Sequence, residues 1–149
     1  MNPPANNWRL FAHPLLDEQL QALNVKVLRG FIKSGTTSKV PRARKILERI
    51  FSLMQYEIPQ NPNNPVYRLG STLGEVEKVW FRAKMFGQYR LFFRFDSAAK
   101  IIVYVWVNDQ ESLRAYGSKT DAYALFQKML ASGYPPGSFE ELLKQSREI

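Results

Sequence analysis

Apolar residues in the first third of the chain recur at intervals of three and four residues, which predicts two helices. The first helix begins after Pro14 and ends near Gly30. Its apolar stripe consists of Leu16, Leu20, Leu23 and Val27. The second begins at Pro41, because proline suits the first turn of a helix. Its apolar stripe consists of Ile46, Leu47, Ile50, Phe51 and Met54, and its opposite face carries Arg42, Lys45 and Arg49.

The pattern then changes to the alternation of period two that is typical of strands. Residues 59–74 are rich in Pro, Asn and Gly and connect the second helix to these strands. We expect three antiparallel strands, at 78–85, 88–95 and 101–107. The first turn lies at Gly87.

Four cations lie on the first two of these strands: Arg82, Lys84, Arg90 and Arg94. A two-residue loop at the first turn places the first two on the opposite face from the last two. A loop one residue longer brings all four to one face, because a slip of one residue reverses every side chain of a strand. Both registers are compatible with the sequence.

Two further helices are expected after the strands. Residues 121–130 form the first, with Thr120 at its N-cap, and Ser138 caps a short helix from Phe139 to about Arg147. Helix, helix, sheet and helix in this order predict one α/β (α+β) domain over residues 1–149, in which two N-terminal helices pack on a small antiparallel sheet.

The net charge of +8 is concentrated in the middle of the chain. Residues 26–108 carry 15 Lys and Arg against 5 Asp and Glu, whereas the segments on either side are slightly acidic. The basic strands also contain many aromatic residues. Phosphates bind cations and bases stack on rings, so this combination favours single-stranded RNA as the partner. A solvated basic surface is the alternative.

Several classes of protein are excluded or disfavoured. The chain has no cysteine, which rules out disulfides and thiolate chemistry, and only one histidine, His13, for which a structural role is favoured. No metal-binding or phosphate-loop motif occurs, and pairs such as Glu75 and Glu77 fit helix capping or solvation better than a metal site. No secretory signal or run of about 20 apolar residues is present. We therefore expect a cytoplasmic protein without metal or cofactor.

Cleavage of RNA without a metal remains compatible with these residues. The ribose 2′-hydroxyl attacks the adjacent phosphorus, and arginine or lysine neutralises the charge that builds on the phosphate oxygens. A tyrosine or lysine near other cations can have a lowered pKa and move a proton. The groups available for this chemistry are Arg82, Lys84, Arg90, Arg94, Tyr116, Lys119 and Tyr123.

Four segments in order resemble the YhaV toxins of type II toxin–antitoxin systems, within the RelE/ParE superfamily. They are NWRLFAHPLL near the start, NPNNPVYRLGSTLG, WFRAKMFGQYRLFFRF and VWVNDQESLRAYGSKTDAYALFQKML. The resemblance implies a RelE-like toxin, an endoribonuclease that cuts mRNA on the ribosome and arrests growth. It also implies a cognate antitoxin of the PrlF type with an AbrB-like fold, and binding to operator DNA only through the toxin–antitoxin complex.

The resemblance also assigns roles to residues. Arg82 is the first candidate for an essential residue, and the other catalytic candidates are Lys84, Arg90, Arg94, Lys119, Asp121 and Tyr123. Apart from the resemblance, the basic face of the second helix adds Arg42, Lys45 and Arg49 as RNA-binding candidates, and Arg114 and Tyr116 are further ones. Structural alternatives exist: Arg90 and Arg94 can form ion pairs, and Tyr123 can belong to the core.

Two other functions have to be weighed against mRNA cleavage. A ParE-like toxin of the same fold inhibits gyrase by protein contact and cuts no RNA. A regulatory module binds RNA, with an affinity that falls as salt rises, but leaves the strand intact. The four segments favour the first function, the ribonuclease.

Overall fold

The computed structural model describes residues 5–34, 41–69, 79–108 and 122–149. Its helices are α1 (Pro14–Ser34), α2 (Pro41–Ser52), α4 (Ala122–Ser132) and α5 (Phe139–Gln145). Its strands are β1 (Arg9–Ala12), β2 (Phe81–Met85), β3 (Tyr89–Asp96), β4 (Ile101–Val107) and β5 (Arg147–Glu148). Short helical turns at Leu53–Glu57, Ile58–Gln60 and Pro65–Tyr67 lead from α2 towards the sheet. No helix in these ranges is both long enough and apolar enough to cross a membrane.

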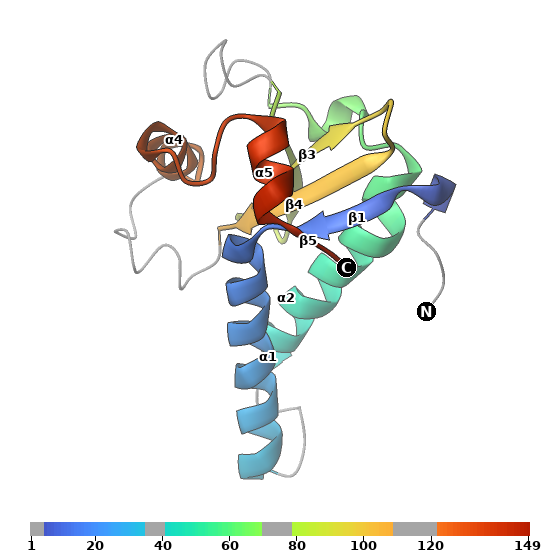
Figure 1. Ribbon diagram of the computed structural model, residues 1–149. Helices are drawn as coiled ribbons and strands as arrows, with labels where there is room; N and C mark the ends of the chain where they lie inside the picture. The colour runs from blue at the N-terminus through green and yellow to red at the C-terminus, as the bar shows by residue number, and fades with distance from the viewer. Residues whose placement is uncertain (1–4, 35–40, 70–78, 109–121) are drawn as a thin grey trace.

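The five strands form one sheet in the order β2-β3-β4-β1-β5, which confirms the α+β class (Figure 1). The three predicted strands lie next to one another and are antiparallel, as expected. The sheet as a whole is mixed, however, because β1 pairs parallel with β4. The strand signal of β1 is only four residues long and its partner lies far along the chain, so local alternation did not reveal it.

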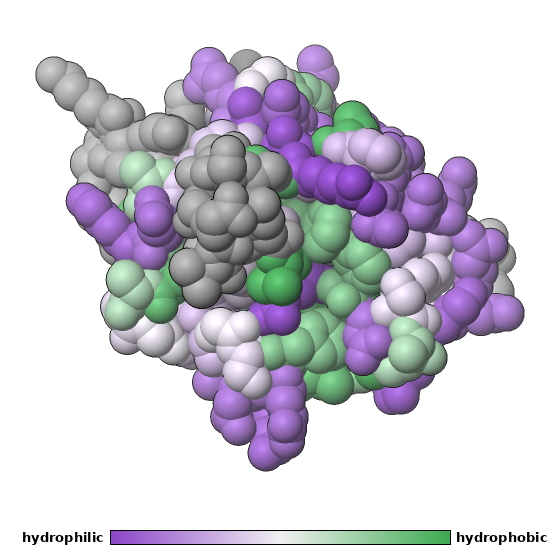
Figure 2. All heavy atoms as spheres, turned by 90° about the horizontal axis from the view of Figure 1, so that it is seen from above, coloured by the Kyte–Doolittle hydropathy of each residue, from purple (hydrophilic) through white to green (hydrophobic). Residues whose placement is uncertain are grey.

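Helices cover both faces of the sheet (Figure 1). One face packs on α1 and α2, through core residues that include Leu16, Leu23, Ile46 and Ile50. The other face packs on α4 and α5, chiefly through Phe126. The far end of α1 extends away from the sheet (Figure 1). Seen from above, hydrophilic residues occupy much of the margin and hydrophobic ones gather towards the middle (Figure 2).

This double cover buries most aromatic residues of the basic strands. Trp80, Phe92 and Phe93 are fully buried, and Trp106 is 3% exposed. Phe126 stacks on Phe92 with 4.3 Å between the ring centroids. These rings therefore belong to the core and stabilise the fold, and they offer no stacking surface to RNA bases.

His13 joins α1 to the sheet and to α5. Its backbone N–H donates to the Tyr104 carbonyl of β4 at 2.9 Å. Its ring is fully buried; Nδ1 accepts from the Leu15 N–H at 3.2 Å, as an N-cap does, and Nε2 lies 2.7 Å from the Gln145 Oε1. With Nδ1 as acceptor, the ring is neutral and Nε2 donates. The contacts support the structural role that the sequence favours.

The last residues of the chain complete the sheet on the far side of β1. Ile149 N–H donates to the Leu10 carbonyl at 2.9 Å. Arg147 binds Asp17 of α1 at 2.7 Å, and Arg9 of β1 binds Glu148 at 2.9 Å. Segments from both ends of the chain are thereby joined beside α1.

We predict that His13 makes stability depend on pH. Burial, partly offset by the Gln145 hydrogen bond and the Asp17 charge, lowers the pKa of His13 below its ordinary value. The unfolded chain therefore binds a proton more readily, and the free energy of unfolding falls as the pH drops below about 6.5. The urea midpoint should decrease between pH 7 and 5 by more in the parent than in His13→Asn, which keeps a capping group but cannot titrate. Equal pH slopes for the two proteins would contradict the prediction.

Candidate active site

A three-residue turn places the four cations of β2 and β3 on one face. Met85 pairs with Tyr89, so the loop consists of Phe86, Gly87 and Gln88. Phe86 (φ 50°) and Gly87 (φ 74°) adopt left-handed conformations, and Gln88 N–H donates to the Phe86 carbonyl at 2.8 Å. Of the two registers that the sequence allows, the structure has the one with the longer loop.

Asn108 holds the start of β3 in this register. Its side chain is buried; Oδ1 accepts from the Arg90 N–H at 2.5 Å and Nδ2 donates to the Gln88 carbonyl at 3.1 Å. The Asn108 N–H in turn donates to the Arg90 carbonyl at 3.2 Å. Asn108 is not among the residues predicted from the sequence, although a polar residue directly after an all-apolar strand is a signal for such a role.

The hydroxyl of Tyr123 joins two of the cations. Arg82 Nε donates to this oxygen at 2.9 Å and Arg90 Nε at 3.1 Å. Arg82 Nη1 also donates to the Val66 carbonyl at 2.8 Å, and Arg90 Nη1 to the Gly87 carbonyl at 2.7 Å. Helix α4 and strands β2 and β3 thus fix both guanidinium groups around one phenol oxygen.

Lys84 completes the group, which we call the Tyr123 cluster: Arg82, Lys84, Arg90 and Tyr123. Lys84 lies directly opposite Arg90 in the strand register and is exposed. Within the described residues it has no hydrogen-bonding or ion-pair partner. Like charges opposite each other destabilise a sheet, so this pair is unfavourable for folding alone. Such local conflicts are typical of functional sites.

The cluster has unused hydrogen-bonding capacity suited to a phosphate. In the described parts of the chain, the Nη2 groups of Arg82 and Arg90 have no acceptor. Guanidinium groups bind phosphate oxygens with paired N–H donors and stay charged at any physiological pH. Two of them, fixed by further hydrogen bonds and beside a lysine, can neutralise charge that develops on a phosphate.

The same arginines change the acidity of the phenol. Burial acts to raise the pKa of Tyr123, but the hydrogen bonds and positive charges of Arg82 and Arg90 outweigh it, so that this pKa lies below its ordinary value. A phenol of lowered pKa gives up its proton more easily and is better suited to moving a proton at neutral pH.

Arg94 does not join the Tyr123 cluster. It lies on the same sheet face towards the other end of β3, where Nη1 donates to the Gly137 carbonyl. Its guanidinium lies 5.3 Å from the ring centroid of Trp80 and 5.5 Å from that of Phe139. These contacts hold the segment before α5 on the sheet, which supports a structural role for Arg94.

The cations of α2 lie apart from the cluster. Arg49 forms an ion pair with Glu57, whereas Arg42 and Lys45 are exposed near the β2–β3 turn. The remaining candidates lie outside the described residues: Arg114, Tyr116, Lys119 and Asp121. So does the proposed cap Thr120, together with Glu75 and Glu77.

A basic α+β fold that fixes two arginines around a phenol, beside an exposed lysine, is suited to a protein that acts on a polyanion. The chain matches, over residues 10–147, the model of a family described as "Toxin with endonuclease activity, of toxin-antitoxin system". It belongs to this family, the YhaV toxins, and an antitoxin is therefore its partner.

Curated relatives agree with this assignment. The chain is 40% identical over 147 residues to "Ribonuclease toxin YhaV" of Escherichia coli strain K12, covering 96% of this chain and 94% of that protein. "Toxin YhaV" of Escherichia coli O157:H7 matches with the same identity and coverage. No solved structure matches the chain significantly.

We predict that Tyr123 ionises below the ordinary tyrosine pKa of about 10 and that Arg82 is one cause. An ultraviolet titration of the parent minus that of Tyr123→Phe isolates this phenol. In an Arg82→Gln background the difference curve should move to higher pH, since a donor and a charge are lost while burial remains. Lys84→Gln should move it less, because Lys84 does not bond to the hydroxyl. Equal shifts for Arg82→Gln and Lys84→Gln would show that the hydrogen bond from Arg82 does not lower the pKa of Tyr123.

Proposed function

We propose that this protein is an endoribonuclease that cleaves mRNA on the ribosome and thereby inhibits translation and growth. The observation that carries the proposal is the Tyr123 hydroxyl held between Arg82 and Arg90. The endonuclease activity of the family and the ribonuclease name of a relative that matches nearly the full chain support it.

The proposed reaction is attack by a ribose 2′-hydroxyl on the adjacent phosphorus, without a metal ion. The 2′-oxygen forms a bond to phosphorus and gives up its proton, while the bond from phosphorus to the 5′-oxygen breaks and that oxygen takes up a proton. Arg82 and Arg90 bind the non-bridging oxygens through their Nη2 groups and stabilise the charge there. We assign Tyr123 to move one of the two protons, since its pKa is lowered.

Lys84 adds to the positive field without contacting the phenol. It is exposed next to Arg90 and can bind the phosphate that follows the cleaved one. We do not assign Arg94 to phosphate binding, because its guanidinium contacts Gly137, Trp80 and Phe139.

The antitoxin is proposed to be of the PrlF type with an AbrB-like fold, as the sequence resemblance implies, and to bind operator DNA for the complex. An antitoxin that covers the Tyr123 cluster would inhibit cleavage directly. The net charge of +8 suits a partner of opposite charge and speeds association with both RNA and such an antitoxin. The site of action is the cytoplasm, where mRNA is translated.

We predict that Arg82→Ala lowers the rate of mRNA cleavage by a factor of about 10²–10³, the usual cost of removing one preorganised group that stabilises a transition state. The parent and the variant are incubated with a translating extract and labelled mRNA, and new 5′ ends are mapped. Lys128→Ala, which removes an exposed cation from α4, is the matched control and should cleave like the parent.

Three outcomes would contradict parts of the proposal. Cleavage by Arg82→Ala at the parental rate would remove Arg82 from the reaction. Equal cleavage of the same RNA without ribosomes would exclude ribosome dependence. Absence of cleavage by the parent, with DNA supercoiling inhibited instead, would favour a gyrase inhibitor.

A further inference from the structure

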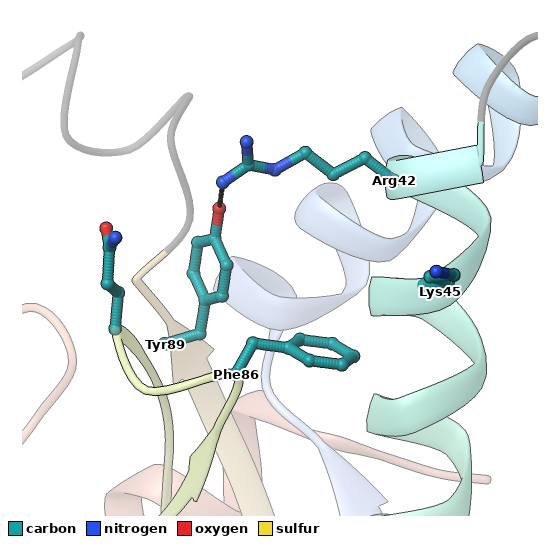
Figure 3. A pocket seen from close by; sticks show the side chains of 5 residues that line it. Arg42, Lys45, Phe86 and Tyr89 are labelled. Atoms are coloured by element: carbon teal, nitrogen blue, oxygen red, sulfur yellow. Dashed lines mark hydrogen bonds between the residues drawn. The ribbon is translucent and has the colours of Figure 1, made fainter.

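A second basic site lies on the other side of the β2–β3 turn. A cavity of about 330 Å³ opens between α2 and the turn and is lined by Arg42, Lys45, Phe86, Gln88 and Tyr89. We call it the basic hollow. Figure 3 shows Arg42 reaching from α2 to the hydroxyl of Tyr89, with the ring of Phe86 pointing towards α2. Its volume is at the lower end of the range for ligand pockets.

The basic hollow and the Tyr123 cluster lie on opposite faces of the same hairpin. Tyr89 and Arg90 are neighbours in β3 and point to opposite faces of the sheet. Tyr89 packs with the core beneath α1 and α2, whereas Arg90 binds Tyr123. The turn connects them, because Arg90 Nη1 donates to the Gly87 carbonyl at 2.7 Å.

Arg42, one of the two cations of the hollow, is unfavourable for the helix that carries it. It lies in the first turn of α2, which contains no acidic residue. The N-terminus of a helix carries a positive partial charge, so cations there repel it and a bound anion would relieve that repulsion. In the described residues Lys45 has no hydrogen-bonding or ion-pair partner.

Phe86 is also placed against the usual preferences. Its side chain is 53% exposed and its φ of 50° lies in the left-handed region, where bulky residues are rare. A polar residue or glycine would fit this position at lower cost in both solvation and strain. Strain of this kind is typical of sites where the side chain serves a ligand.

We propose that the basic hollow binds one nucleotide of the same RNA strand, across the β2–β3 turn from the cleaved bond. Arg42 and Lys45 bind its phosphate, the ring of Phe86 stacks on its base, and the Gln88 amide bonds to the base edge. The strand crosses the turn at Gly87, where even an added Cβ would meet nothing within 4 Å. This inference rests on the proposed function, since it supposes an RNA substrate.

The residues favour RNA over an acidic segment of the antitoxin. The carboxylates of such a segment would pair with Arg42 and Lys45 but would make no favourable contact with the exposed ring of Phe86. A nucleotide uses all three kinds of group, because single-stranded RNA is recognised by charge, stacking and base edges together.

The test measures binding of a fluorescent single-stranded RNA made uncleavable by 2′-O-methyl groups, by anisotropy with the full-length protein. Phe86→Ala should weaken binding roughly tenfold through lost stacking. Lys45→Gln should lower the slope of log affinity against log salt by about 0.7, the value for one phosphate of a single strand. Arg44→Gln removes a cation from the same turn of α2 but not from the hollow, since Arg44 pairs with Glu48; it should bind like the parent.

A second measurement separates stacking from folding defects. A set of RNAs is prepared, each with one abasic position. The parent should bind one member of the set more weakly than the others, and Phe86→Ala should bind all members equally. Phe86→Leu keeps an apolar group on the turn and should also bind all members equally. If both variants still discriminate, the stacking role is overturned.

The remaining outcomes distinguish this inference from the proposed function. Parental RNA affinity in Phe86→Ala and Lys45→Gln would overturn the hollow as a nucleotide site, whether or not the parent cleaves mRNA. The same result with weakened antitoxin binding would assign the hollow to the antitoxin. Weakened RNA binding in these variants, with full cleavage by Arg82→Ala, would support the hollow and contradict the proposed active site.

Discussion

The register of the β2–β3 hairpin is the constraint on which the candidate active site depends. With Phe86, Gly87 and Gln88 in the turn, Arg82, Lys84 and Arg90 share one face. A loop shorter by one residue would turn one strand over, and Tyr123 could then contact only one of the two arginines. Phe86 and Gly87 have left-handed backbone conformations. Just after the turn, the buried side chain of Asn108 binds the Gln88 carbonyl and the Arg90 N–H. Local backbone geometry thus decides whether the phenol has two cationic partners.

Among the described residues, charges are placed unfavourably for folding on each side of the β2–β3 turn. Lys84 lies opposite Arg90 on the neighbouring strand, and the first turn of α2 carries Arg42 where acidic residues are favoured. Neighbouring surfaces show the ordinary solution, with ion pairs such as Arg44 to Glu48. The two exceptions lie on either side of one turn. A polyanion bound across that turn would reduce the charge repulsion in both places, so that a single ligand would stabilise both.

Local patterns allowed much of the fold to be predicted. The strand at 101–107 has the expected bounds, and Ser138 caps α5 as its sequence indicates. The β1 strand was missed because all of its partners lie more than ninety positions away, and no local periodicity indicates such a pairing. At the site, the four strand cations were identified but their common face was left open, since it depends on one residue of loop length. The contact of Tyr123 with two arginines depends on how α4 packs, which the sequence does not encode locally.

The pairing of β1 has a consequence for how the chain folds. Arg9 pairs with Ile101, and Ala12 pairs with both Tyr104 and Arg147, so β1 acquires its neighbours only after most of the chain has been synthesised. The β2–β3–β4 segment has only local connections and can form first, whereas contacts that span many residues form slowly. Until β4 emerges from the ribosome, α1 can pack on α2 but lacks the strand that it covers, so part of its apolar stripe stays exposed. We therefore expect the growing chain to depend on chaperones for most of its synthesis.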